Sequence, residues 1–150
     1  MGLKETLQSD LTEAIRSRDE LLSGTIRMVL TAITNEEVAG KEARTLSDEE
    51  IITVLSREAK KRREAAEAFA EAGRADRAER EKAEGDVIAK YLPAQLSDDE
   101  LNALIAEAIA STGAAGPADM GKVMGVLKPK IAGKADGSKV SGAVKAALAK

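Results

Sequence analysis

The residues of this sequence that could take part in chemistry are lysines and glycines near its carboxyl end. Residues 119–140 read DMGKVMGVLKPKIAGKADGSKV, and the last thirty residues hold seven lysines against a single acid, a local net charge of +6. Lysine ammonium groups beside open backbone suit phosphate groups, because glycine places no side chain in the way. The candidate phosphate-contacting residues are Gly121, Gly125, Lys122, Lys128, Lys130, Lys134 and Lys139.

Two interpretations of this segment compete. Gly121 and Gly125 lie four residues apart, on one face of a helix, which also suits close packing of a neighbouring helix, and packing is the interpretation that we favour for Gly125. A run of like charges is also often plain solvated surface. If nucleic acid is the ligand, the scarcity of aromatic residues and the absence of Arg from the segment favour contacts to the phosphates of a folded RNA over the reading of a base sequence.

Other classes of chemistry lack the residues that they need. The chain has no Cys and no His, which excludes disulfides, thiolate nucleophiles, imidazole bases and the usual zinc sites. Residues 116–123, GPADMGKV, nearly match a nucleotide-binding P-loop, but Val123 stands where a Ser or Thr hydroxyl would hold magnesium. We therefore expect no catalytic residue, no metal site and no cofactor in this chain.

One cation of the amino-terminal half is expected to have a structural part. Arg62 lies seven residues from both Leu55 and Phe69, so it falls in the apolar seam of its helix. A cation in such a place needs a carboxylate that offsets its desolvation. We predict that the partner is Glu36, and that the two form a structural ion pair.

Helices are expected to position these residues. Apolar side chains recur at helical spacing from residue 3 to residue 33 and from residue 51 to residue 69, and no strand-like alternation occurs. Ser47 and Ser97 each precede a glutamate by three residues, which is the pattern of a capping box that opens a helix. The sequence therefore predicts an all-α protein.

The helices are expected to form two domains. Pro93 disfavours helix in the residue before it, and the helices that follow are shorter. We predict an amino-terminal four-helix bundle-like domain over residues 1–93 and a small three-helix domain over residues 94–150. No apolar run reaches the ~18 residues that span a bilayer, and the first residues are too polar for a secretory signal, so the cytoplasm is the expected location.

Several segments resemble the YqeY family. They are IRMVLTAITNEEV (26–38), REAKKRREAAEAF (57–69), AGRAD (72–76), YLPAQLSDDEL (91–101) and the lysine-rich residues 119–148. The resemblance covers nearly the whole chain and implies a helical bundle followed by a three-helix domain. The family is similar to the tail domain of the B subunit of the tRNA-dependent amidotransferase, which contacts transfer RNA.

The resemblance implies contact with tRNA. It also carries the label of a carbon–nitrogen ligase with glutamine as amido-N-donor, but the catalytic parts of the amidotransferase lie in other domains and another subunit. We therefore expect an accessory, non-catalytic tRNA-binding protein that works beside an amidotransferase or an aminoacyl-tRNA synthetase complex, and we assign the tRNA contact to the lysines and glycines named above. A helical protein–protein adaptor and a free-standing amidotransferase-related enzyme stay open as alternatives.

Overall fold

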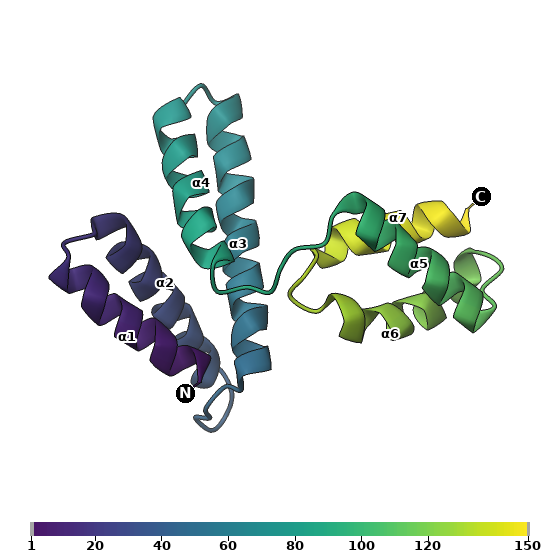
Figure 1. Ribbon diagram of the computed structural model, residues 1–150, viewed down its shortest axis with the longest axis horizontal. Coiled ribbons are helices and arrows are strands. Elements are labelled where there is room, and N and C mark those ends of the chain that lie inside the picture. The colour runs from purple at the N-terminus through teal and green to yellow at the C-terminus, as the bar shows by residue number, and fades with distance from the viewer. Residues whose placement is uncertain (1, 150) are drawn as a thin grey trace. The chain divides into compact units, whose positions relative to one another are not determined.

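The computed structural model describes residues 2–149, and within them it shows helices and no strand (Figure 1). The predicted all-α class is therefore confirmed. The helices are α1 (Leu3–Arg16), α2 (Glu20–Glu37), α3 (Asp48–Glu71), α4 (Ala75–Ala89), α5 (Asp98–Thr112), α6 (Met120–Ile131) and α7 (Gly137–Leu148), with a 3-10 turn at Pro117–Asp119 before α6.

Contacts divide the chain into two compact units, of which the first ends at Leu92 and the second begins at Pro93. In the first unit α1 packs along α2 and α3 packs along α4, and α2 also contacts both α3 and α4 (Figure 1). Its core is aliphatic, with side chains such as Leu7, Ile33 and Leu55 almost fully buried. In the second unit α5, α6 and α7 all contact one another around a separate aliphatic core.

Local hydrogen bonds determine where the helices begin. At Ser47 the hydroxyl accepts the Glu50 N–H at 3.2 Å, while the Glu50 carboxylate accepts the Ser47 N–H at 3.2 Å. Ser97 and Glu100 form the same reciprocal pair at the start of α5, at 3.1 and 3.2 Å. Both predicted capping boxes are thus present. Each satisfies two backbone N–H donors that would otherwise have no partner at the start of the helix.

The last turn of α6 contains a proline. Pro129 does not end the helix, which continues to Ile131. A proline in the last turn removes one N–H but still fits the helical φ. The chain then turns through Gly133, whose φ of 72° lies in the left-handed region that favours glycine, and the Asp136 carboxylate caps α7 by accepting the Ser138 N–H at 3.1 Å.

The structure corrects the predicted partner of Arg62. The Arg62 guanidinium lies 3.4 Å from the Glu81 carboxylate and 3.6 Å from that of Glu84, both on α4. Glu36 instead lies 3.4 Å from Arg57. Positions 57 and 62 are five residues apart, which is about 140° around a helix. The side of α3 that meets the end of α2 is therefore not the side that carries Arg62, which faces the hairpin partner α4.

Glu37, the last residue of α2, joins three segments of the first unit. It is 8% exposed, and its carboxylate accepts the Lys4 ammonium of α1 at 2.7 Å and the Leu46 N–H at 3.2 Å. The Lys4 hydrogen bond, and then the bond from Leu46, lower the pKa of the Glu37 carboxyl. The charged carboxylate thus holds the connection between α2 and α3 against α1.

We expect the substitution Glu37→Gln to lower the melting temperature at neutral pH, because a neutral amide is a weaker acceptor for the Lys4 ammonium. The folded pKa of Glu37 lies below the unfolded value of about 4.3. Its contribution is therefore present above that pH and is lost as pH falls through the folded pKa. Melting curves of both proteins between neutral and acidic pH should converge on the acidic side. Glu42→Gln, in the exposed connection, is the control, and equal melting temperatures of Glu37→Gln and the wild type at neutral pH would contradict the account.

Candidate nucleic-acid interface

Two consecutive helices position the candidate residues. α6 buries Val123, Leu127 and Ile131, which are 0%, 0% and 6% exposed. α7 buries Val140, Val144 and Leu148, again 0%, 0% and 6% exposed. These i, i+4, i+8 stripes form most of the core of the second unit together with α5, and each therefore determines which residues of its helix point to solvent.

The two helices carry the same pattern of residues, seventeen positions apart. Residues 123–132 read VMGVLKPKIA and residues 140–149 read VSGAVKAALA. The buried positions match pairwise, and so do Gly125 with Gly142 and Lys128 with Lys145. The repeat was not predicted from the sequence, and Lys145 and Gly142 were not among the predicted site residues. The signal that finds them is the alignment of the two short helices on their buried residues.

The solvent side of each helix carries small residues and a lysine. On α6, Gly121, Gly125 and Lys128 follow one another at i, i+4 and i+7, and all are exposed. On α7, Ser138, Gly142 and Lys145 repeat this spacing and exposure. Residues so spaced share one face of a helix.

The interpretation of Gly125 as a packing glycine is wrong. A Cβ atom built at Gly125 meets nothing within 4 Å, and the same holds at Gly121 and Gly142. Nothing in the described part of the chain therefore requires these glycines. Glycine inside a helix lowers its stability by about 1 kcal/mol relative to alanine, so the open positions carry a cost that the fold itself does not explain.

The exposed faces of α6 and α7 that carry Lys128 and Lys145 point away from α5. Lys130, two residues after Lys128, reaches Glu107 of α5 at 3.8 Å. Ala147, two residues after Lys145, lines a groove with α5. Two residues correspond to about 200° around a helix. Lys128 and Lys145 therefore lie on the sides of α6 and α7 that face away from α5.

The five candidate lysines and Lys145 divide into two groups according to their ion pairs. Lys122 lies 3.6 Å from Asp119, Lys130 lies 3.8 Å from Glu107, and Lys139 lies 2.5 Å from Asp98. These pairs are exposed and individually weak. Lys128, Lys134 and Lys145 form no ion pair with the residues that the structure describes.

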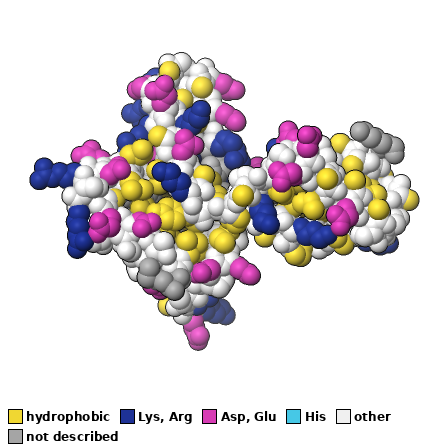
Figure 2. Space-filling model, viewed as in Figure 1, with side chains coloured by type: hydrophobic (Ala, Val, Ile, Leu, Met, Phe, Trp, Pro, Cys, Tyr) yellow, Lys and Arg dark blue, Asp and Glu magenta, His cyan; other side chains and the backbone are white. Residues whose placement is uncertain are grey.

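We call Lys128, Lys134 and Lys145 with Gly121, Gly125 and Gly142 the lysine face. Lys134 is exposed and lies in the turn between α6 and α7. From Pro93 onwards the second unit holds six acids against seven lysines, so its excess of positive charge is local. Figure 2 shows cations and acids side by side on the visible side of this unit. Within the described part of the second unit, the lysines of this face differ from Lys122, Lys130 and Lys139 because they form no ion pair, and on α6 and α7 they lie beside exposed glycines.

The backbone at Gly125 is open in a second way. Pro129 has no N–H, so it cannot donate the i+4 hydrogen bond that the Gly125 carbonyl would receive in a regular helix. Gly125 therefore offers both a missing side chain and a carbonyl without its helical donor, one turn from Lys128. The Gly125 carbonyl can accept a hydrogen bond from a ribose hydroxyl while the Lys128 ammonium contacts a phosphate.

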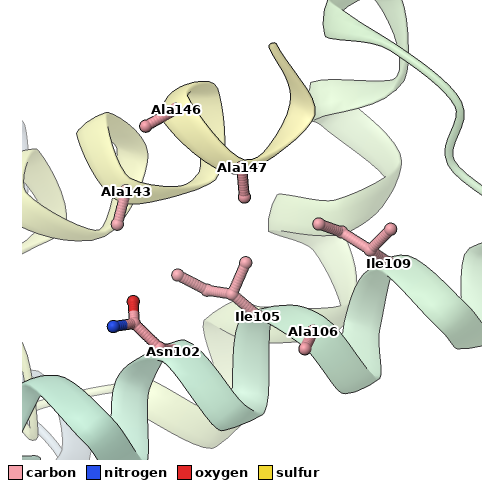
Figure 3. A pocket seen from close by; sticks show the side chains of 7 residues that line it. All are labelled: Asn102, Ile105, Ala106, Ile109, Ala143, Ala146 and Ala147. Carbon is pink, nitrogen blue, oxygen red and sulfur yellow. The ribbon is translucent and has the colours of Figure 1, made fainter. Parts of the chain in front are cut away.

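A groove between α5 and α7 has a different character. It has a volume of about 420 Å³, and Figure 3 shows Asn102 and Ile105 of α5 pointing toward Ala143 and Ala147 of α7. All the residues that line it are alanine, isoleucine or asparagine. The groove offers no charge to a phosphate, so it belongs to a different kind of contact from the lysine face.

In residues 2–149 no three Cys, His, Asp or Glu side chains are placed to hold a metal ion. None of the helices over those residues is long and apolar enough to cross a membrane.

The fold and the lysine face define an all-helical protein of two units with a basic pair of helices near its carboxyl end. The chain belongs to the YqeY family, since the Yqey-like protein family matches residues 4–148. The resemblance drawn from the sequence segments is thereby confirmed.

Curated relatives come from yeasts. Altered inheritance of mitochondria protein 41, mitochondrial, of Candida glabrata is 32% identical over 87 residues, which cover 58% of this chain and 48% of that protein. The protein of the same name in Clavispora lusitaniae is 34% identical over 67% of this chain and 58% of its own length. An uncharacterized protein of Schizosaccharomyces pombe is 29% identical over 65% and 77%.

The matched part thus spans about half the length of the two proteins named for mitochondrial inheritance. Their names place those two proteins in mitochondria, and the cytoplasmic location expected for this chain stays a prediction.

Because a methyl group fits at the exposed glycines, we expect Gly125→Ala and Gly142→Ala to stabilise the second unit by about 1 kcal/mol each. Hydrogen exchange of the α6 and α7 amides reports this local stability. Gly113→Ala is the matched opposite, because Gly113 has a φ of 68° that alanine adopts with strain. Faster exchange in Gly125→Ala would show that packing does require this glycine.

Proposed function

We propose that the lysine face binds the phosphate backbone of transfer RNA and that the protein is an accessory, non-catalytic tRNA-binding protein. The observation that carries the proposal is that α6 and α7 each place, on the same face, a lysine that forms no ion pair within residues 2–149 and a glycine at which an added Cβ would meet nothing within 4 Å. A phosphate backbone explains both features, since it attracts the ammonium group and needs bare backbone to approach closely.

The residue types favour recognition of shape over sequence. The lysine face holds no arginine for bidentate contact to a base and no aromatic ring for stacking. Point-charge contacts to phosphates and an open carbonyl near a ribose suit a folded RNA. Because the family is similar to the amidotransferase tail domain, we propose tRNA as the bound RNA. The protein would act beside an amidotransferase or an aminoacyl-tRNA synthetase complex.

The proposal concerns binding, and any carbon–nitrogen ligase activity would belong to partner proteins. The adaptor alternative would use uncharged surface such as the groove between α5 and α7. The two alternatives differ in their response to salt. Phosphate binding weakens steeply as salt rises, whereas a contact through alanine and isoleucine does not.

We expect the triple substitution of Lys128, Lys134 and Lys145 by Glu to weaken binding of unfractionated tRNA by at least about a hundredfold. Wild-type affinity should fall with salt at a log–log slope of about −3, one unit for each lysine. Fluorescence anisotropy with labelled tRNA measures both quantities.

The matched control reverses three exposed lysines of the first unit, Lys41, Lys82 and Lys90, and changes net charge by the same amount. An equal loss in the control would show attraction by total charge alone. Binding that ignores both salt and the site substitutions would reject the lysine face and favour an adaptor.

The glycines allow stability and binding to be separated. We expect Gly125→Ala to make α6 more stable and yet to weaken tRNA binding by about tenfold, because a methyl group holds the backbone of the RNA away from a site that depends on close approach. Gly24→Ala is the control, since Gly24 is also an exposed helical glycine with open space around it, on α2 of the first unit. Unchanged affinity of Gly125→Ala would remove bare backbone from the account.

A further inference from the structure

Two segments that characterise the sequence, YLPAQLS and GKADG, meet in the second unit. The Gln95 side-chain amide donates to the Gly133 carbonyl at 2.8 Å and to the Pro93 carbonyl at 2.9 Å. The Leu96 N–H donates to the Lys134 carbonyl at 2.9 Å. The short segment that follows the first unit is thereby attached to the turn between α6 and α7.

The Gln95 side chain connects two parts of the backbone that are 38 residues apart in sequence. A carboxamide has two N–H donors, and both are used here. One bond shapes the segment at Pro93, and the other holds the turn at Gly133. No other side chain of the same shape supplies two donors, because glutamate and methionine can donate to neither carbonyl.

The same contacts hold the backbone of Lys134 on both sides. Its N–H donates to the Ile131 carbonyl at 2.8 Å, and its carbonyl accepts the bond from Leu96. Gly133, directly before it, has the φ of 72° that the turn requires. The direction of the exposed Lys134 side chain therefore depends on the bonds from Gln95 and Leu96.

We propose that Gln95 is a positioning residue for Lys134, and that RNA bound at the lysine face and closure of the 93–96 segment onto the α6–α7 turn favour each other. The inference rests on the proposed function. Gln95 is exposed, and exposed hydrogen bonds open readily. A phosphate held by Lys134 stabilises the closed state, and by linkage the closed state raises the affinity for the phosphate.

A Gln95 side chain that only stabilised the turn would have a different signature. Its loss would change hydrogen exchange of the free protein but would leave the number of phosphate contacts unchanged. A positioning role changes that number. It therefore alters the salt slope of binding, and it alters the effect of RNA on the exchange of the Leu96 amide.

The test uses the full chain with Gln95→Met, a neutral substitution of similar length without donors, and unfractionated tRNA as the probe. We expect affinity to fall by about fivefold and the salt slope to fall by about one unit. Lys134→Ala should then have little further effect in the Gln95→Met background. Binding of tRNA should slow exchange of the Leu96 amide in the wild type and not in Gln95→Met. Gln8→Met, an exposed glutamine of α1, is the control.

Unchanged affinity and slope in Gln95→Met, or effects of Gln95→Met and Lys134→Ala that simply add, would overturn the inference while leaving the lysine face intact. A wild-type chain that does not bind tRNA would remove the proposed function and this inference together. If Gln95→Met folds poorly, Lys134→Ala alone provides the second measurement. It should abolish the slowing of Leu96 exchange by tRNA, and persistence of that slowing would overturn the coupling.

Discussion

The periodicity of the α-helix is the constraint from which the candidate site follows. α6 and α7 each bury three aliphatic residues at i, i+4 and i+8, and this leaves the opposite stripe of each helix in water. In both helices that stripe holds glycine and lysine. Alanine would be better for the helix at these glycines, by about 1 kcal/mol each. The proposed contact with a ligand rests on this repetition of the costly residue at equivalent positions with free space around it.

The acids of the second unit neutralise some of its lysines and so limit the extent of the candidate site. α5 and the turn before α6 carry five of the six acids that follow Pro93, and three of them lie beside Lys122, Lys130 and Lys139. The cations nearest to α5 are thus partly neutralised, whereas Lys128 and Lys145 point away from it. Among the described residues, the positive charge without a neighbouring acid is therefore confined to fewer lysines than the net charge of the segment suggests. Two of these lysines lie beside the exposed glycines of α6 and α7.

Much of the fold could be predicted from the sequence because it depends on local rules. Ser47 and Ser97 mark helix starts, since capping boxes use residues three positions apart. The partner of Arg62 could not be predicted, because it depends on which helix lies against that side of α3. Gly125 was misjudged for a related reason. A spacing of four shows that two residues share a face, but it does not show whether that face meets protein or water.

The candidate site was partly visible in the sequence. Lys128, Lys134 and the glycines of α6 were assigned from the clustering of lysines with glycines and from the family resemblance, whereas Lys145 and Gly142 joined the site only when α7 was aligned with α6 on their buried residues. The hydrogen bonds of Gln95 join positions 38 residues apart. No local sequence pattern predicts such a contact, although the two segments that it joins, YLPAQLS and GKADG, are each distinctive.

An NMR titration of the isotope-labelled full chain with unfractionated tRNA tests the central claim most directly, because it locates the contact without any substitution. The account predicts that the largest changes in backbone amide shifts fall on Gly121, Gly125 and Gly142 and on the turn at Lys134, and that they disappear at high salt. Changes confined to the groove around Ile105 and Ala147, or to the first unit, would contradict it.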